Sequence, residues 1–162
     1  MAGDQHCAVV SDVTDPDGIS TAVAEVTSAL GPIDVVVNNA GQRQDFGRLD
    51  ELDVAEWRRV VEANLSSAFY VARAVVPGMI ERRTGSIVNI ASVLGLRGGA
   101  GRISYTASKF AVVGLTQALA AEVASRAGPG PAEPEPAERY AAALLTQMES
   151  SFAHCWPVIL SL

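Results

Sequence analysis

A tyrosine and a lysine four residues apart are the pair in this sequence best suited to proton transfer. Tyr105 and Lys109 fall in a run with helical character, so their side chains share one helix face. Among the 12 lysines and arginines, Lys109 is the only lysine. A cation about 4 Å from a phenolate, at an effective dielectric constant of about 20, stabilises it by roughly 4 kcal/mol. The pair therefore predicts a tyrosine that exchanges a proton with a substrate, whereas the alternative is a lysine lying along apolar surface with its charge in water.

Three further polar positions could complete a site around this pair. Ser92 follows the apolar run Gly85–Ala91, where a hydroxyl can hold a substrate carbonyl or simply cap a loop. Asn64 falls on the apolar face of a helix, so its amide needs a partner, either backbone or a relay water. Asn38-Asn39-Ala40-Gly41 follows another apolar run, where small residues let the backbone approach a ligand.

The elements that must position these residues alternate between strand and helix. Apolar runs of strand length cover Cys7–Ser11, Ile33–Val37 and Gly85–Ala91, and helical spacing covers Ile19–Leu30, 53–76 and 104–126. Asp15 or Asp17 can cap the first helix, and Gly31-Pro32 ends it. Such alternation predicts an α/β fold, a Rossmann-like, doubly wound parallel sheet with right-handed crossovers.

The chain changes character after Arg126. Residues 128–137 hold four of the eight prolines and predict an extended linker between a domain at 1–127 and a tail at 138–162. Within that tail, residues 138–150 could form a helix, and the apolar end 152–162 has no strand context.

Composition narrows the classes of function. The net charge of −6 argues against general affinity for nucleic acid or anionic membranes. No apolar run reaches the roughly 18 residues that span a bilayer, and no signal peptide is evident, so we expect a cytoplasmic protein. Cys7 and Cys155 are far apart and predict reduced thiols. His6 and His154 lie near opposite ends, which gives no basis for a metal site.

The order of these motifs resembles the short-chain dehydrogenase/reductase family. Asp12-Val13, Asn38–Gly41, Asn64, Ser92 and Tyr105-x-x-x-Lys109 occur in the family's sequence order. The segments around them look most like the 3-oxoacyl-[acyl-carrier-protein] reductases and related alcohol or sugar dehydrogenases. The resemblance covers about residues 7–126 and, as a set, these motifs are highly specific.

The resemblance implies a role for each residue. Tyr105 would be the general acid that protonates a carbonyl oxygen, and Lys109 would favour its phenolate form and hold the nicotinamide ribose. Ser92 would polarise the carbonyl, and Asn64 would anchor a relay water. The cofactor would be NAD(P), with NADP favoured, and the substrate a carbonyl or alcohol compound such as a 3-oxoacyl thioester. The remaining cofactor-binding residues would be Asp12 and Val13 beside the adenine, and Asn39, Ala40 and Gly41 along the cleft.

The sequence also departs from the family pattern. The family's Thr-Gly-x-x-x-Gly-x-Gly turn, which holds the pyrophosphate, does not occur, and the glycines at 95–101 do not follow a strand as that turn does. We therefore expect a chain truncated at both ends, its sheet lacking the first two and the last strands and leaving apolar surface exposed. The resemblance also implies a homo-oligomer formed through helices 53–76 and 104–126. The alternative to an enzyme is an inactive fragment that docks through these helices onto full-length homologues.

Overall fold

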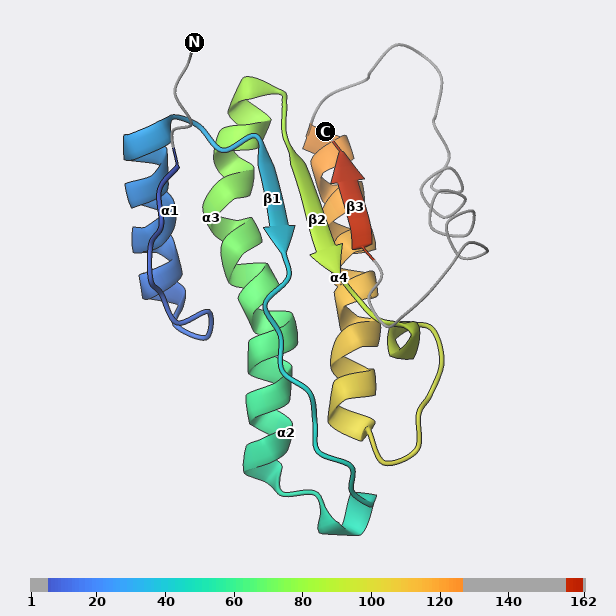
Figure 1. Cartoon of the computed structure of the whole chain (residues 1–162). Coiled ribbons are helices and arrows are strands. Elements are labelled where there is room, and N and C mark those ends of the chain that lie inside the picture. Colours follow the sequence, from blue (N-terminus) through green and yellow to red (C-terminus); the bar gives the residue numbers. More distant parts are fainter. Residues whose placement is uncertain (1–5, 127–156, 162) are drawn as a thin grey trace.

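A three-stranded sheet organises the computed structural model, which describes residues 6–126 and 157–161 (Figure 1). Strand β1 (Val35–Asn38) pairs in parallel with β2 (Ser86–Ile90), and Val36 lies opposite Ile87. Strand β3 (Pro157–Ser161) pairs with the other edge of β2 in the antiparallel direction. The sheet order is therefore β1-β2-β3.

Helix α1 (Pro16–Leu30) begins and ends where its local chemistry requires. The Asp15 side chain accepts a hydrogen bond from the backbone N–H of Asp17, and Pro16 occupies the first turn. Gly31 ends the helix at φ 92°, a left-handed value that favours glycine. Of the two capping residues expected from the sequence, the structure uses Asp15.

A long helical rod follows β1 and consists of three consecutive segments. These are α2 (Val54–Val61), the π-helical turn η2 (Glu62–Ser66) and α3 (Ser67–Arg82). The expected helix at 53–76 is confirmed, but it continues through Pro77 for another turn. The buried Met79 lies in that turn and packs on the sheet, which explains why the helix runs on despite the lost hydrogen bond.

The core lies between α3, the sheet and α4 (Ile103–Arg126). The bounds of α4 match the helix expected at 104–126. Apolar side chains of α3 recur every three or four residues and therefore form one buried stripe. The stripe meets Ile87 of β2 and Val123 of α4. Burial of these side chains fixes both helices on the same face of the sheet. The α3 members of this cluster are Ala72, Val75, Val76 and Met79.

The expectation of a strand at Cys7–Ser11 is wrong. These residues form no strand, and the side chain of Val10 is fully exposed. A strand requires a hydrogen-bonding neighbour, and none of the described strands pairs with this segment.

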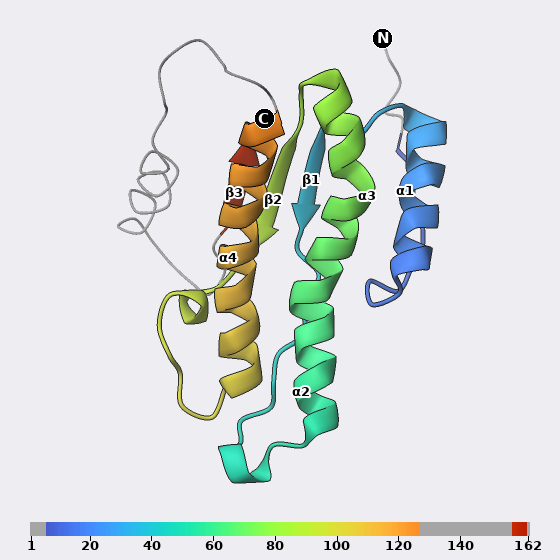
Figure 2. The ribbon, with the colours of Figure 1, turned by 180° about the vertical axis from the view of Figure 1, so that it is seen from behind.

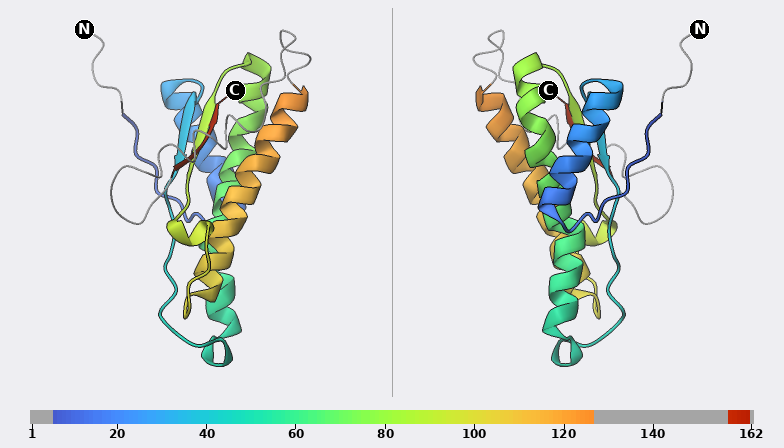
Figure 3. Two further views of the ribbon diagram at one scale, coloured as in Figure 1. Left: turned by 90° about the vertical axis from the view of Figure 1, so that its right-hand side faces the viewer. Right: turned by 90° about the vertical axis from the view of Figure 1, so that its left-hand side faces the viewer.

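The expected α/β class and the parallel pairing of β1 with β2 are confirmed, whereas the described residues do not complete a doubly wound sheet with helices on both faces. Helices α3 and α4 cover one face, α1 lies beside α3, and no described helix covers the opposite face (Figures 2 and 3). Val35 and Val37 of β1 accordingly remain 61% and 59% exposed. The expected exposed apolar surface is thus present on β1. The prediction that the chain end lacks strand context is wrong for residues 157–161, which add an antiparallel strand to the sheet. The fold is a mixed α/β arrangement with two parallel strands.

The proposed linker at 128–137 and the helix expected at 138–150 lie outside the described residues. Within the described part of the chain, none of the helices is long and apolar enough to cross a membrane.

Candidate active site

The segments that carry the predicted catalytic residues come together where the carboxyl ends of β1 and β2 approach the first half of α4 (Figure 1). Because β1 and β2 are parallel, the segments after Asn38 and after Ile90 leave the sheet at the same end. The first carries Asn39–Gly41 and the second carries Ser92. Helix α4 presents Tyr105 and Lys109 beside them.

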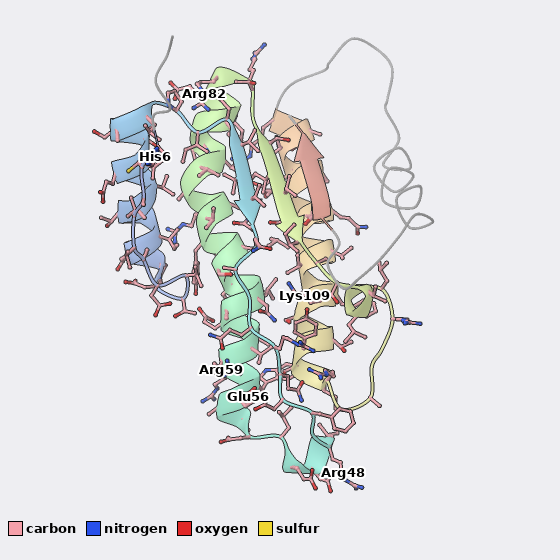
Figure 4. The ribbon with its side chains drawn as sticks, viewed as in Figure 1. His6, Arg48, Glu56, Arg59, Arg82 and Lys109 are labelled. Atoms are coloured by element: carbon pink, nitrogen blue, oxygen red, sulfur yellow. The ribbon has the colours of Figure 1, made fainter. Side chains whose placement is uncertain are left out.

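Lys109 is the most constrained charge of the site. Its side chain is 5% exposed, and among its interactions Nζ donates a hydrogen bond to the backbone oxygen of Ile90, 2.7 Å away. Nζ also lies 5.8 Å from the centre of the Tyr105 ring, within the range of a cation–π contact. Figure 4 shows Lys109 projecting from α4 toward the segment that follows β1. The alternative of a lysine with its charge in water is therefore wrong.

The segment that carries Ser92 lies against the turn of α4 that carries Lys109. Ile90, two residues before Ser92, accepts a hydrogen bond from the Lys109 ammonium through its backbone oxygen. Three residues after Ser92, Gly95 packs tightly on α4, and a Cβ added there would lie 2.8 Å from the Lys109 carbonyl oxygen. The Ser92 oxygen is buried and accepts a hydrogen bond from the backbone N–H of Leu94, 3.2 Å away. Ser92 thus caps η3 (Val93–Gly95), and this bond does not use its O–H group as a donor.

Asn64 binds the loop after β1 through its side chain. Oδ1 accepts from the backbone N–H of Gln42 at 2.6 Å, and Nδ2 donates to the Gln42 carbonyl at 2.9 Å. Nδ2 also donates to Oγ of Ser108 in α4, at 3.0 Å. The structural tie to backbone, one of the two expectations for this residue, is confirmed. The π-helical turn that contains Asn64 widens the helix at this point, as is common near functional sites.

Asn39, Ala40 and Gly41 form an exposed stretch of loop, in which only Asn39 has a side chain larger than a methyl group. A Cβ at Gly41 would lie 2.9 Å from Asn64 Oδ1 and 3.7 Å from Lys109 Nζ. Only glycine therefore fits at position 41, between the ammonium group of Lys109 and the Asn64 side chain, which clamps the backbone of Gln42.

Asp12 and Val13 lie in the turn that precedes α1. The Asp12 carboxylate accepts from both the backbone N–H and the hydroxyl of Thr14, each at 2.8 Å. These bonds, the backbone one first, hold the pKa of Asp12 below its usual value. Asp12 is exposed and Val13 half-buried, and no described contact links either to Lys109.

Comparison with known proteins adds the decisive observation. A family model for short chain dehydrogenases matches residues 1–127. The chain belongs to the short-chain dehydrogenase family. The resemblance inferred from the motifs is therefore confirmed.

Three relatives show how much of the family the chain represents. It is 45% identical to nodulation protein G of Azospirillum brasilense over 117 residues, which is 71% of this chain and 46% of that protein. The 3-oxoacyl-[acyl-carrier-protein] reductases FabG of Vibrio cholerae and Thermotoga maritima are 40% and 44% identical, over 76% and 72% of this chain and 50% and 47% of theirs. The chain thus spans about half the length of the curated relatives it matches.

The structure of this short-chain dehydrogenase also contains polar residues that sequence reasoning did not select. Gln44 and Ser108 are buried and bind the residues around Tyr105. Asn89 of β2 accepts from Asn38 and donates to Thr116 of α4, which ties the two strand ends to the helix. Helical spacing from Tyr105 could have pointed to Ser108 and Thr116, whereas Gln44 lies in a loop with no periodic signal.

We predict that Asn64→Ala lowers the free energy of unfolding by about 1–3 kcal/mol, because it leaves both backbone groups of Gln42 without their partner. Urea denaturation would measure the loss. Asn39→Ala, in the exposed part of the same loop, is the matched control and should change stability by less than about 0.5 kcal/mol. Equal stability of the two variants would show that the clamp contributes nothing.

We predict that Thr14→Val raises the pKa of Asp12 toward its ordinary value without reaching it, because the Thr14 backbone N–H still donates. Since the folded-state pKa is lowered, this carboxylate stabilises the protein above its unfolded pKa, and the contribution is lost as the pH falls through the folded value. Carbon-13 NMR of the carboxyl group during a pH titration would follow the change. Thr27→Val, in the last turn of α1, is the control, and the same titration in both variants would refute the role of the hydroxyl.

Proposed function

We propose that this chain carries the proton-transfer half of an NAD(P)-dependent oxidoreductase that interconverts a carbonyl and an alcohol. The observation that carries the proposal is the buried Lys109 ammonium beside the Tyr105 ring, at the carboxyl ends of two parallel strands. The similarity to 3-oxoacyl-[acyl-carrier-protein] reductases favours a 3-oxoacyl thioester or a similar compound as substrate and NADP over NAD.

Each residue has a distinct part in this chemistry. The bound nicotinamide would supply the hydride that reaches the carbonyl carbon. Tyr105 would donate its hydroxyl proton to the carbonyl oxygen, and the Lys109 ammonium would stabilise the phenolate that remains. Ser92, whose O–H group is not used in its bond with Leu94, would donate to the same oxygen. Asn64 would hold the loop that faces the cofactor, and a relay water there remains a prediction.

The loop after β1 suits a ribose and a nicotinamide ring. Asn39, Ala40 and Gly41 are exposed and leave the backbone open, and Lys109 Nζ lies within 3.7 Å of the Cβ position of Gly41. An ammonium group donates several hydrogen bonds, so Lys109 can serve ribose hydroxyls as well as Ile90. Asp12 and Val13 would flank the adenine.

We predict that Tyr105→Phe lowers kcat for reduction of a 3-oxoacyl thioester by about 10²–10⁴-fold, the usual share of general acid catalysis. Binding of NADPH, followed by fluorescence titration, should change less than twofold because the ring itself remains. Lys109→Met should weaken both binding and turnover. Tyr70→Phe removes the phenol that bonds Glu62 on the helical rod and is the control.

The possible results separate the two parts of the proposal. Turnover that survives Tyr105→Phe would refute the assigned general acid. A folded wild-type chain that binds no NADPH would refute the cofactor site and leave the second candidate.

The second candidate is an inactive partner that docks on full-length relatives. Phe69 of α3 and Phe110 of α4 are 47% and 45% exposed, so each of these helices leaves a large apolar side chain uncovered. Both helices lie on the same side of the sheet (Figure 2). Burial of these side chains against another chain would form either a homo-oligomer or a mixed dimer.

We predict that Phe110→Asp abolishes such association, because a carboxylate would be buried without a partner. Native mass spectrometry of the chain, alone and co-expressed with a full-length 3-oxoacyl-[acyl-carrier-protein] reductase, would detect both kinds of dimer. Leu96→Asp, at a similarly exposed leucine in the loop after η3, should leave association unchanged. A monomer under both conditions would refute the docking role.

A further inference from the structure

Gln44 belongs to the loop after β1, and its side chain reaches the N-terminus of α4. The residue is 1% exposed. Its Oε1 atom accepts three hydrogen bonds: from the backbone N–H of Ser104 at 2.9 Å, from the Ser104 hydroxyl at 2.7 Å, and from the backbone N–H of Tyr105 at 3.4 Å. The first amides of a helix have no partner within the helix. A side chain sixty residues away in the sequence thus supplies the cap of the helix that carries Tyr105 and Lys109.

The segment that carries this cap is itself fixed on both sides. The Gln44 carbonyl accepts from Nη1 of Arg102 at 2.8 Å, and the backbone N–H of Gly47 donates to the Gly101 carbonyl at 3.2 Å. Upstream, Asn64 clamps Gln42. Gln44 is therefore held in place by its own backbone and does not depend on the cap for its position.

The backbone carbonyl of Tyr105 is also connected, through two side chains, to the loop that carries Gln44. Ser108 Oγ donates to the Tyr105 carbonyl at 2.8 Å and accepts from Nδ2 of Asn64. The backbone of Tyr105 is thus linked on one side to Gln44 and on the other, through Ser108 and Asn64, to Gln42. The loop expected to meet the cofactor and the residue expected to move the proton form one hydrogen-bonded unit.

We infer that Gln44 is a positioning residue for Tyr105. By binding the N–H groups of Ser104 and Tyr105, it fixes the first turn of α4 and therefore the place of the phenol relative to Lys109. Its catalytic consequence rests on the proposed function, although the cap itself does not.

A second feature of Gln44 sharpens the test. Its Nε2 atom is buried and has no hydrogen-bond partner among the described residues. Only the oxygen therefore contributes to the cap. A glutamate keeps an acceptor at this position, and its negative charge suits a helix N-terminus, so it should replace the glutamine. Leucine has a similar volume but no acceptor.

The experiment compares Gln44→Leu and Gln44→Glu with Gln117→Leu, a control at an exposed glutamine of α4. In Gln44→Leu the amides of Ser104 and Tyr105 should exchange with deuterium about tenfold faster, the equivalent of one lost hydrogen bond. The nuclear Overhauser effect between the Tyr105 ring and the Lys109 side chain should weaken. Gln44→Glu should restore both. Where the chain reduces a 3-oxoacyl thioester, kcat should fall in Gln44→Leu while KM for NADPH stays constant.

Two results would overturn the inference: exchange and Overhauser effects in Gln44→Leu that match the Gln117→Leu control, or a Gln44→Glu variant as perturbed as Gln44→Leu. If Gln44→Leu does not fold, Gln44→Asn carries the same test, because the shorter side chain withdraws the acceptor but keeps the amide. Exchange and Overhauser measurements need no turnover. A chain that binds no NADPH would therefore refute the proposed function while the cap is still tested.

Discussion

The ammonium group of Lys109 is buried against the last carbonyl of β2, and the rest of the site follows from that bond. A buried charge is tolerated only with close polar partners, so helix α4 must lie where Lys109 can reach Ile90. That requirement places the Tyr105 ring 5.8 Å from the charge and brings the Ser92 segment against the same turn of helix. One interaction between a helix and a strand end thus sets the relative positions of three predicted catalytic residues.

Polar contacts extend this constraint to the loop after β1. Asn64, in a widened π-helical turn, binds both backbone groups of Gln42, and Gln44 caps the helix that carries the tyrosine. Gly41 fits between Asn64 and Lys109 because it has no side chain. Such a network is stiff, since moving any member leaves a buried polar group without a partner. Stiffness of this kind is what a site for proton transfer needs, because small displacements of reacting groups are costly.

The sheet presents the opposite situation. Its helices lie on one face, and valines of β1 remain largely exposed on the other. The chain also spans about half the length of the relatives it matches. A well-defined polar site therefore adjoins an apolar surface that is not covered within the described residues. This contrast separates the proposed proton-transfer site, which hydrogen bonds hold in place, from a sheet face that the described residues leave open.

The sequence alone determined the parts that depend on local pattern. Helical and strand periodicity located α1, α4, β1 and β2, and short-range chemistry limited the α1 cap to Asp15 or Asp17 and placed the end of that helix at Gly31. The order of the motifs, from Asp12 to the Tyr105–Lys109 pair, pointed to the family. Only the tertiary structure decided which segments find partners. The run at 7–11 has strand character but no neighbouring strand, the segment 157–161 pairs with β2, and Gln44 caps a helix sixty residues away. Strand pairing and the capping of a helix by a distant side chain join residues far apart in the chain, so no local pattern encodes them.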